Sequence, residues 1–547
     1  MSNELTIKKK LVLSSNQVLL LVSCYFTLVF NYPFLSRLFN GSLSSSDSNL
    51  LFLLSLPVFL MALISLLFSL FIPTKIMKPM LSLLVMLSSL IWFAQVNYGI
   101  VFDYSMVQNV FETDSAEAFT YLNMAAVIEV FAVSLIPLVF IYLVKVEPRC
   151  FWRSVKSRVG LILISFVVLL GVVYPQYSDF SAVGRNNHDA INYLIPFKLL
   201  DSSYKYIRDT YIYPAEPYKL LDNSPQLLTN EKQLTILVVG ETARAQNFSL
   251  NGYKKPTNDF TSKLNVTSFK AVTSCGTATA ISVPCMFSRL NHDNYDKRIA
   301  ANQQNVLDVV KAAGLSVTWL DNNSSCKGVC ERITSIKVDP TQNSDLCDGE
   351  YCYDEIMIDY LDSIISQMHS DNKLIVLHMI GSHGPTYYKR YPANHAVFLP
   401  HCNRSDIQNC TKEELLNTYD NTIRYTDYVL SLLINRLNSI SNQSDTNTQL
   451  LYVSDHGESL GENGVYLHGF PYALAPEDQT HIPMIYWNSQ GLEQPEQTCI
   501  KALENKRLSH DELFDSLLGL VKVKSKIYQQ NHDVFSSCAR RAQLVAR

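Results

Sequence analysis

The first third of the chain alternates between long apolar runs and short polar segments. Five apolar runs cover residues 17–37, 49–72, 80–102, 124–144 and 159–174. A helix of about 20 residues crosses the ~30 Å hydrocarbon core of a bilayer; most of the runs reach that length, and the fifth reaches it with its flanks. Any single run is compatible with a helix in a soluble core, but five in succession with few charges indicate membrane spans. The first run shows no small-residue cleavage site and is followed by further spans, so it does not indicate a cleaved signal peptide.

Basic residues gather in three of the polar segments between these runs. They precede span one, or lie between spans two and three or between spans four and five: Lys8, Lys9, Lys10, Lys75, Lys78, Lys145, Arg149, Arg153, Lys156 and Arg158. The other two segments are poor in lysine, and one carries the acids Asp103, Glu112, Asp114 and Glu117. Loops rich in lysine and arginine remain in the cytoplasm. We therefore expect everything after span five to lie outside the cytoplasm. Glu129 falls within span four near its end, where a solvated position and a functional one are both open.

The pattern changes after residue 175. Residues 176–231 form a connector rich in tyrosine: Tyr177, Tyr193, Tyr204, Tyr206, Tyr211, Tyr213 and Tyr218. Aromatic rings with polar tips favour the membrane–water boundary, so we expect a segment lying along the interface; ordinary packing beneath a soluble domain is the alternative.

Residues 232–547 alternate short apolar strands with helical stretches. The strand candidates are "LTILVVG", "SVTWLD", "KLIVLHM", "LLYVSD" and "IPMIYW", and the helix candidates include "NVLDVVKAAG", "YDEIMIDYLDSIISQM" and "KEELLNTYDNTIRYTDYVLSLLINRL". This alternation predicts an α/β domain with a largely parallel sheet. We expect a five-helix membrane domain over 1–175, the connector over 176–231 and one catalytic domain over 232–547.

Cysteine usage agrees with an exported domain. The 547-residue chain has a formal net charge of −4 and 12 cysteines. Cys24 and Cys150 lie in the membrane part without a role that we can assign. The other cysteines follow residue 270 as neighbouring pairs: Cys275/Cys285, Cys326/Cys330, Cys347/Cys352, Cys402/Cys410 and Cys499/Cys538. An even number in an exported domain favours disulfides, because the spacings lack the two-residue knuckles typical of structural zinc sites.

Three predicted strands end on side chains that bind metals. "TILVVGE" ends at Glu241, "LIVLH" at His378 with His383 five residues on, and "LLYVSDH" at Asp455 and His456. Ligands of α/β sheets bind beyond the carboxyl ends of the strands. Two carboxylates and an imidazole suit Zn²⁺ with one position open, or less well Mn²⁺.

The stretch "SCGTATAISVPCMFS" offers a fourth ligand. Pro284 lacks an amide hydrogen and favours the first turn of a helix, which predicts a helix start near 281–284 with Thr279 just before it. A hydroxyl there would face a phosphate-binding helix end, and coordination to Zn²⁺ would make it a nucleophile. Alternatively, Thr277, Thr279 and Ser282 are helix-capping and turn residues. Residue chemistry alone leaves both Thr277 and Thr279 open as the nucleophile.

Several long motifs resemble one family. "VVGETARAQNFSLNGY", "TSCGTATAISVPCMFS", "HMIGSHGPTYYKRYP", "NTYDNT" and "YVSDHGESLGENGVYLHG" are similar to lipid A phosphoethanolamine transferases of the EptA type, which are related to the mobile colistin-resistance enzymes. The resemblance covers essentially the whole chain. It implies five spans in the bacterial inner membrane before an alkaline-phosphatase/sulfatase-like domain in the periplasm.

The resemblance also assigns residues. It implies that Thr279 is the nucleophile and that Glu241, Thr279, Asp455 and His456 bind a catalytic Zn²⁺. His383 and His468 would bind phosphate, act as acid and base, or hold a second zinc. The remaining implied residues are those of substrate and donor-headgroup binding: Asn109, Thr113, Glu117, Ser324, Lys327 and, from its strand-end position, His378. The disulfides of the family fit all five cysteine pairs.

The implied reaction is ping-pong transfer of phosphoethanolamine from phosphatidylethanolamine to a lipid A phosphate, which lowers polymyxin binding. We expect membrane lipids as partners, no nucleic acid, and a monomer. A phosphoglycerol transferase or sulfatase with the same core, or a sensor on an inactive scaffold, are the rivals. A sulfatase would need a cysteine or serine nucleophile motif that we do not find, and an inactive scaffold would have no need of Glu241, Thr279, Asp455 and His456 together.

Overall fold

The computed structural model describes residues 11–43, 50–113, 123–177, 180, 188–214, 216–342, 344–490 and 494–538. The chain divides into two compact units, Met1–Asp103 with Asn123–Lys205 and Tyr104–Leu122 with Tyr206–Arg547. We call them the membrane unit and the catalytic unit and describe each by itself. The segment Tyr104–Leu122, which lies between two apolar helices in the sequence, belongs to the catalytic unit. The three-part division at residues 175 and 231 stays a prediction.

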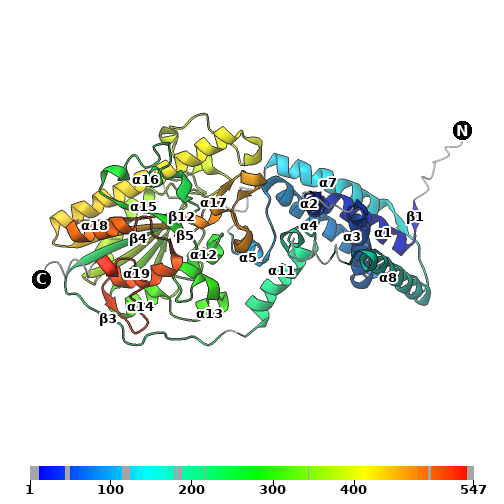
Figure 1. Cartoon of the computed structure of the whole chain (residues 1–547), viewed down its shortest axis with the longest axis horizontal. Helices are drawn as coiled ribbons and strands as arrows, with labels where there is room; N and C mark the ends of the chain where they lie inside the picture. The colour runs from blue at the N-terminus through cyan, green and yellow to red at the C-terminus, as the bar shows by residue number, and fades with distance from the viewer. Residues whose placement is uncertain are drawn as a thin grey trace. The chain divides into compact units, whose positions relative to one another are not determined.

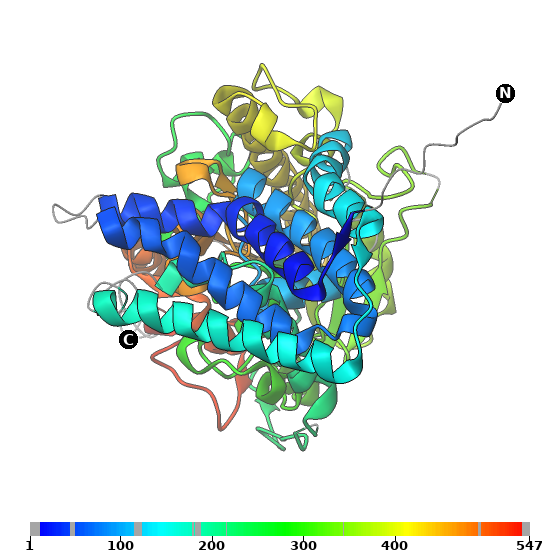
Figure 2. The same ribbon diagram turned by 90° about the vertical axis from the view of Figure 1, so that its right-hand side faces the viewer.

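The membrane unit is helical, as its apolar runs predict. Its main helices are α1 Ser15–Tyr25, α2 Tyr32–Leu43, α3 Leu50–Phe71, α4 Met77–Tyr98, α7 Met124–Leu143 and α8 Phe151–Val173. Within the described residues, four stretches are long and apolar enough to cross a membrane, namely Leu51–Phe71, Thr74–Tyr98, Met124–Leu143 and Phe151–Gln176. The bent pair α1 and α2 would make a fifth span. Figure 2 shows α8 running alongside α3. The predicted membrane domain is confirmed with four to five spans.

The first span differs from the single run predicted over 17–37. It bends by 57° between Phe30 and Tyr32. The buried side chain of Asn31 lies at the bend, where its Nδ2 donates to the carbonyls of Phe26 and Ile195, each at 2.9 Å, and its Oδ1 accepts from the Ile195 amide at 2.9 Å. Pro33 follows without an amide hydrogen to continue the helix. The polar side chain of Asn31 therefore has hydrogen-bond partners although it lies inside an apolar unit.

The fifth span is longer than predicted because α8 begins at Phe151. Arg153, Lys156 and Arg158 consequently lie in its first turns rather than in a loop. Arg158 Nη2 donates to Thr74 Oγ1 at 3.0 Å, so the basic start of α8 meets the segment between α3 and α4. The short strand β1 Val12–Leu13 pairs with β2 Lys145–Val146 at this end as well. The two basic segments that the structure describes thus lie at one end of the unit, as the predicted orientation requires; the third, with Lys8, Lys9 and Lys10, lies outside the described residues.

Other polar groups of the membrane unit and connector have definite places. Asn97 Nδ2 on α4 donates to Glu129 Oε2 on α7 at 2.9 Å, while Cys24 and Cys150 are free. The connector holds α10 His188–Ile191 and α11 Phe197–Ile207 before β3 Gln226–Leu227 pairs with β14 Val523–Lys524. Its tyrosines differ in solvent exposure: Tyr193 and Tyr206 are buried, while Tyr177, Tyr204 and Tyr211 are exposed. The interfacial position of the connector stays a prediction.

The catalytic unit is built on an eight-stranded sheet in the order β13-β5-β12-β9-β4-β8-β6-β7. The strands are β4 Gln233–Gly240, β5 Thr267–Thr273, β6 Ser316–Asp321, β7 Thr334–Lys337, β8 Asn372–His378, β9 Asn447–Ser454, β12 His481–Asn488 and β13 Leu508–Ser509. All five predicted strands are present. Neighbours pair in parallel except β12, which runs antiparallel to β5 and β9. The alternation did not reveal β5, β7 and β13, because β7 and β13 are short and β5 is partly polar.

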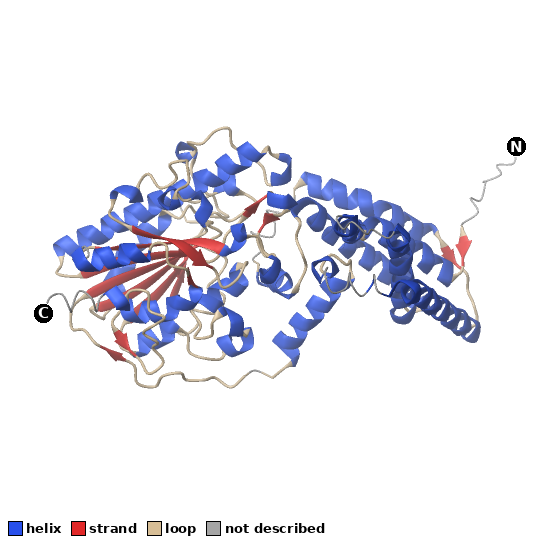
Figure 3. Cartoon of the chain, viewed as in Figure 1, coloured by secondary structure: helices blue, strands red, loops and turns tan. Residues whose placement is uncertain are grey.

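Helices cover both faces of this sheet (Figures 1 and 3). On one side lie α14 Val306–Ala312 and α19 Leu513–Leu520, and on the other α15 Ile356–Gln367 and the long α16 Lys412–Gln443. The three helices predicted from periodicity, α14, α15 and α16, are confirmed. Thr411 and Glu414 form a capping box that fixes the start of α16. The α/β architecture predicted from the sequence is thereby confirmed.

The remaining helices of the catalytic unit are short. They are α5 Tyr104–Glu112, α12 Thr279–Met286, α13 Lys297–Ala301, α17 Glu477–Thr480 and α18 Gln494–Leu503, and a hairpin pairs β10 Ser459–Leu460 with β11 Tyr466–Leu467. All five predicted disulfides form: Cys275–Cys285, Cys326–Cys330, Cys347–Cys352, Cys402–Cys410 and Cys499–Cys538.

Candidate metal centre and nucleophile

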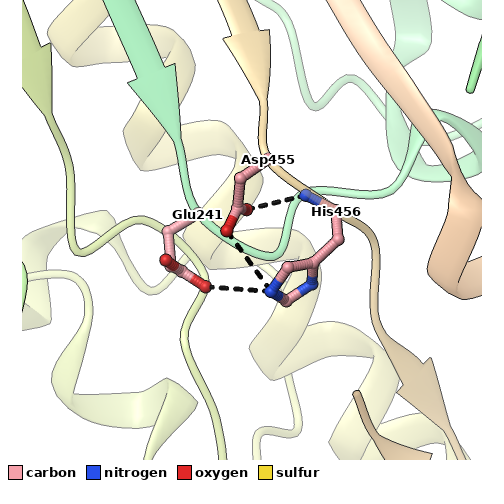
Figure 4. Close-up of side chains that lie close together, drawn as sticks. All are labelled: Glu241, Asp455 and His456. Atoms are coloured by element: carbon pink, nitrogen blue, oxygen red, sulfur yellow. Dashed lines mark hydrogen bonds and ion pairs between the residues drawn. The ribbon is translucent and has the colours of Figure 1, made fainter. Parts of the chain in front are cut away.

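Three metal-binding side chains converge where two central strands end. Glu241 follows β4, and Asp455 and His456 follow the neighbouring parallel strand β9, in a register that pairs Gly240 with Ser454. One ligand atom from each of the three residues lies within 4.8 Å of the others. Figure 4 shows their side chains pointing toward one another, and all three are 0% exposed. The strand-end pattern in the sequence therefore marks one shared site.

Thr279 completes the cluster. Its hydroxyl donates to the Glu241 carboxylate, with distances of 3.1 and 3.2 Å to the two oxygens, and lies 3.4 Å from His456 Nε2. The Thr277 hydroxyl instead donates to the Phe470 carbonyl at 2.6 Å. Between the two threonines that the residue chemistry left open, Thr279 is the one that faces the metal-binding side chains.

The nucleophile helix starts earlier than its proline indicated. Thr279 is the first residue of α12 and Ala278 is its N-cap, so the predicted start near 281–284 is wrong. Pro284 is the sixth residue of the helix instead of lying in its first turn. A proline at that position removes an intrahelical hydrogen bond, and the partner that replaces this bond comes from another element.

The three side chains fit a divalent cation. Asp455 Oδ2 is buried and accepts no hydrogen bond from any described residue. The Nδ1 of His456 contacts the Gly457 carbonyl at 2.8 Å, which leaves the Nε2 lone pair facing Glu241 at 3.5 Å and Asp455 at 3.3 Å. Two carboxylates and a neutral imidazole match the ligand types of Zn²⁺. A cation here would satisfy the carboxylate oxygen that the protein leaves without a donor.

The shifted pKa values of Asp455, Glu241 and His456 also indicate that the site favours a bound positive charge. Burial raises the pKa of Asp455 to about 6, and burial together with the Asp455 charge raises the pKa of Glu241. Burial, with the nearby His468, lowers the pKa of His456 to about 4. At neutral pH the His456 imidazole is therefore uncharged and can bind a metal, while two carboxylates lie together in a fully buried site. Such a site favours a bound cation.

Outer groups hold Glu241 in place. Asn323 Nδ2, after β6, donates to Glu241 Oε2 at 2.7 Å and to the Met379 carbonyl at 2.9 Å. Gly381 has φ +50°, and a Cβ there would lie 2.7 Å from the Glu241 carbonyl oxygen, so glycine is required in "HMIGSHG". His378 is 0% exposed and its ring lies 3.3 Å from Asp321 Oδ2 and 3.4 Å from Asn323 Nδ2. The structure thus places His378 behind Asn323, and its assignment to substrate stays a prediction.

Two further histidines lie beside the cluster. The ring centroid of His468 is 4.6 Å from that of His456 and 5.3 Å from that of His383. His468 Nδ1 lies 2.9 Å from Glu458 Oε2, and the Tyr387 hydroxyl donates to Glu458 Oε1 at 2.6 Å. Burial raises the pKa of Glu458 to about 7. The sequence pattern did not reveal Glu458, although it stands three residues after Asp455 in the motif "YVSDHGESLGENGVYLHG".

The predicted substrate residues divide between two places. Ser324 lines a cavity of about 250 Å³ together with Asn323, Arg390 and the predicted catalytic residue His383. On α5, Asn109 is buried and its carbonyl accepts from the Thr113 hydroxyl at 2.6 Å. Lys327 Nζ joins these two places, since it donates to Ser324 Oγ at 2.8 Å and to the Glu112 carbonyl at 3.2 Å. Glu117 lies outside the described residues. Substrate binding by these groups stays a prediction.

Two residues that the sequence did not reveal fasten the nucleophile segment to β9. Ser282 Oγ donates to the Asp455 carbonyl at 2.5 Å. His510 is buried, its Nδ1 accepts from the Cys275 amide at 3.0 Å, and its Nε2 contacts the Ser454 carbonyl at 2.9 Å. Burial lowers the pKa of His510 to about 4, so the neutral ring can accept at one nitrogen and donate at the other. Both residues tie the stapled segment to the strand that carries two metal-binding side chains.

Known proteins are similar to this chain in sequence and in fold. The family model described as phosphoethanolamine transferase EptA/EptB matches residues 60–211, and the sulfatase family model matches residues 233–523. Phosphoethanolamine transferase EptA of Escherichia coli K12 is 38% identical over 531 residues, which cover 95% of this chain and 96% of that protein. Phosphatidylethanolamine transferase Mcr-1 of Escherichia coli is 37% identical over 466 residues, 82% of this chain and 84% of that one. The structure of the integral membrane lipooligosaccharide phosphoethanolamine transferase A of Neisseria meningitidis superimposes with a TM-score of 0.91 at 34% identity, covering 96% and 99% of the two chains.

Proposed function

This chain belongs to the EptA-type phosphoethanolamine transferase family, and we propose that it moves phosphoethanolamine from phosphatidylethanolamine to a phosphate of lipid A through a covalent intermediate on Thr279. The observation that carries this proposal is the position of the Thr279 hydroxyl among Glu241, Asp455 and His456. A hydroxyl held at a site of this kind is placed to attack phosphorus.

The proposed cofactor is Zn²⁺, held by Glu241, Asp455, His456 and the oxygen of Thr279. Two observations support this ligand set. Asp455 Oδ2 accepts no hydrogen bond from a described residue. The Nδ1 of His456 contacts the Gly457 carbonyl, which leaves its Nε2 to bind the ion. Such an ion supplies a Lewis acid that favours the deprotonated hydroxyl and the charge of a phosphoryl group. The family resemblance also implies a site for a second ion, which His383 and His468 would hold.

In the first half-reaction, the Thr279 oxygen loses its proton and forms a bond to the phosphorus of phosphatidylethanolamine. The bond between phosphorus and the diacylglycerol oxygen breaks, and the departing oxygen takes a proton. His383 and His468 lie beside the cluster, so we assign them to binding the phosphate oxygens and to this proton transfer. The positive end of α12, at whose first residue Thr279 stands, stabilises the negative charge that develops.

In the second half-reaction, a phosphate oxygen of lipid A forms a bond to the same phosphorus and the bond to Thr279 Oγ1 breaks. The threonine oxygen recovers a proton, which returns the site to its starting state. The transferred ethanolamine brings an ammonium group to an anionic surface. Cationic peptides such as polymyxins would then bind that surface less well.

The membrane spans give the reaction its location. Both lipids are confined to a bilayer, and the predicted orientation places the catalytic unit in the periplasm of a bacterium, tethered to the inner membrane. The gathering of basic segments at one end of the membrane unit supports this orientation.

The test uses the full-length protein in membranes that contain phosphatidylethanolamine and lipid A. Mass spectrometry of the extracted lipid A should show added phosphoethanolamine with wild-type protein and none with Thr279→Ala. Addition of phosphoglycerol instead would identify the rival transferase. Unmodified lipid A, with active donor cleavage, would refute lipid A as the acceptor.

A further inference from the structure

Helix α12 lacks one backbone hydrogen bond, at the carbonyl of Ala280, one residue after Thr279. In an α-helix the carbonyl of residue i accepts from the amide of residue i+4, so the Ala280 carbonyl would pair with residue 284. That residue is Pro284, which has no amide hydrogen. Ala280 is 0% exposed, so bulk water does not replace the missing donor. An unpaired buried carbonyl would destabilise this turn of the helix.

The missing donor comes from α5. Gln108 Nε2 donates to the Ala280 carbonyl at 2.8 Å, and Gln108 is itself 0% exposed. The two residues are 172 positions apart in the sequence. The side chain of Gln108 thus supplies the hydrogen bond that Pro284 cannot make.

Helix α5 is also held to other parts of the catalytic unit at its C-terminal end. The carboxylate of Glu112 pairs with Lys297, and the Glu112 carbonyl accepts from Lys327 Nζ at 3.2 Å. Gln108 is therefore presented by a helix whose C-terminal end is anchored rather than by a free loop. Its neighbour Asn109 is one of the residues expected to bind the donor headgroup.

We propose that Gln108 is a positioning residue for the nucleophile: its hydrogen bond to Ala280 holds the first turn of α12 and thereby sets the place of the Thr279 hydroxyl. This inference rests on the proposed role of Thr279. Other polar contacts also hold the segment, among them Ser282 on Asp455, Thr277 on Phe470 and His510 on Cys275. Gln108 acts on the carbonyl of the residue that follows the nucleophile, where a small displacement costs rate steeply.

Pro284 provides an internal rescue test. Replacing it with alanine restores an amide that can pair with the Ala280 carbonyl within the helix, which makes Gln108 redundant. The variants are Gln108→Leu, which removes the donor, Gln108→Glu, which keeps the shape but offers a carboxylate in place of the amide donor, Pro284→Ala, and the double variant Gln108→Leu/Pro284→Ala. Val110→Ala on the exposed side of α5 is the matched control.

The rate of phosphoethanolamine adduct formation on Thr279 is measured in the full-length protein with phosphatidylethanolamine vesicles. We expect Gln108→Leu and Gln108→Glu to slow it about tenfold or more in the wild-type background, as a lost buried hydrogen bond and a shifted nucleophile imply, and Val110→Ala to leave it unchanged. In the Pro284→Ala background, Gln108→Leu should slow it less than about threefold. Equal losses in the two backgrounds would overturn the proposal.

The same four-variant cycle is read independently as melting temperature in detergent, which needs no activity. Gln108→Leu should lower the melting temperature more in the wild-type background than in the Pro284→Ala background, and equal decreases would again contradict the inference. If wild-type protein forms no adduct on Thr279, the proposed function fails, while the melting cycle still decides whether Gln108 replaces the donor lost at Pro284.

Discussion

The hydroxyl of Thr279 donates to Glu241 across the junction between α12 and β4, at 3.1 Å from the nearer carboxylate oxygen. This contact brings a stapled, helix-starting threonine to the carboxyl end of the central strand. The next strand, β9, delivers Asp455 and His456 to the same point. One hydroxyl therefore meets two buried carboxylates, and Asp455 Oδ2 accepts no hydrogen bond from a described residue.

Asp455→Asn should abolish metal binding and phosphoethanolamine transfer, because it removes the buried oxygen that has no donor among the described residues. Metal content by elemental analysis and transfer to lipid A measure the two effects. A variant that retains stoichiometric zinc would contradict the ligand set.

The same substitution should stabilise the metal-free protein in a pH-dependent way. Folding raises the pKa of Asp455 from 3.8 to about 6, so the folded state binds the extra proton in that window and wild-type stability falls as pH rises from about 4 to about 6. Asparagine cannot ionise, so the advantage of the variant should grow over this window to roughly 3 kcal/mol. Denaturant unfolding in chelator at several pH values measures the difference between the two proteins; a difference that does not change with pH would show that Asp455 is not buried as described.

His510→Ala should slow adduct formation on Thr279 about tenfold, because it releases the Cys275 amide from the ring that also contacts Ser454. Stopped single-turnover reactions analysed by mass spectrometry measure this rate. His369→Ala, an exposed histidine just after α15, is the control and should leave the rate intact. An unchanged rate in His510→Ala would show that this ring does not position the nucleophile.

Replacing Cys275 and Cys285 together with alanine should lower both stability and transfer. Closing a loop of this length stabilises a fold by roughly 3 kcal/mol through chain entropy, and the loop here carries Thr279. Replacing Cys402 and Cys410 together should lower the melting temperature without a comparable loss in the transfer rate. Equal losses of rate in the two double variants would mean that the first disulfide has no positional role.

A reporter enzyme fused after Arg547 should be active only outside the cytoplasm, while one inserted in the segment between α3 and α4 should report the cytoplasm. The basic residues at that end of the membrane unit supply the reason. Reversed activities would overturn the predicted orientation.

The sequence predicted the metal-binding trio because each member ends a recognisable strand. It could not show that β4 and β9 are neighbours, since strand order depends on packing across the whole domain. The start of α12 was misplaced because the local rule for proline assumes that a helix must satisfy its own carbonyls. Gln108, 172 residues away, satisfies that carbonyl instead. His510 escaped notice for the same reason, because its partner Cys275 is 235 residues distant. Local patterns revealed the strand ends, whereas long-range hydrogen bonds decided which hydroxyl faces them.

The central claim is that Thr279 carries the transferred group, and intact-protein mass spectrometry with peptide mapping tests it most directly. Full-length wild-type protein, loaded with Zn²⁺ and incubated with phosphatidylethanolamine without acceptor, should gain one phosphoethanolamine on the peptide that contains Thr279. Thr277→Ala should gain the same group, since its hydroxyl faces Phe470, and Thr279→Ala should gain none. An adduct that persists in Thr279→Ala, or that maps to another residue, would contradict the account.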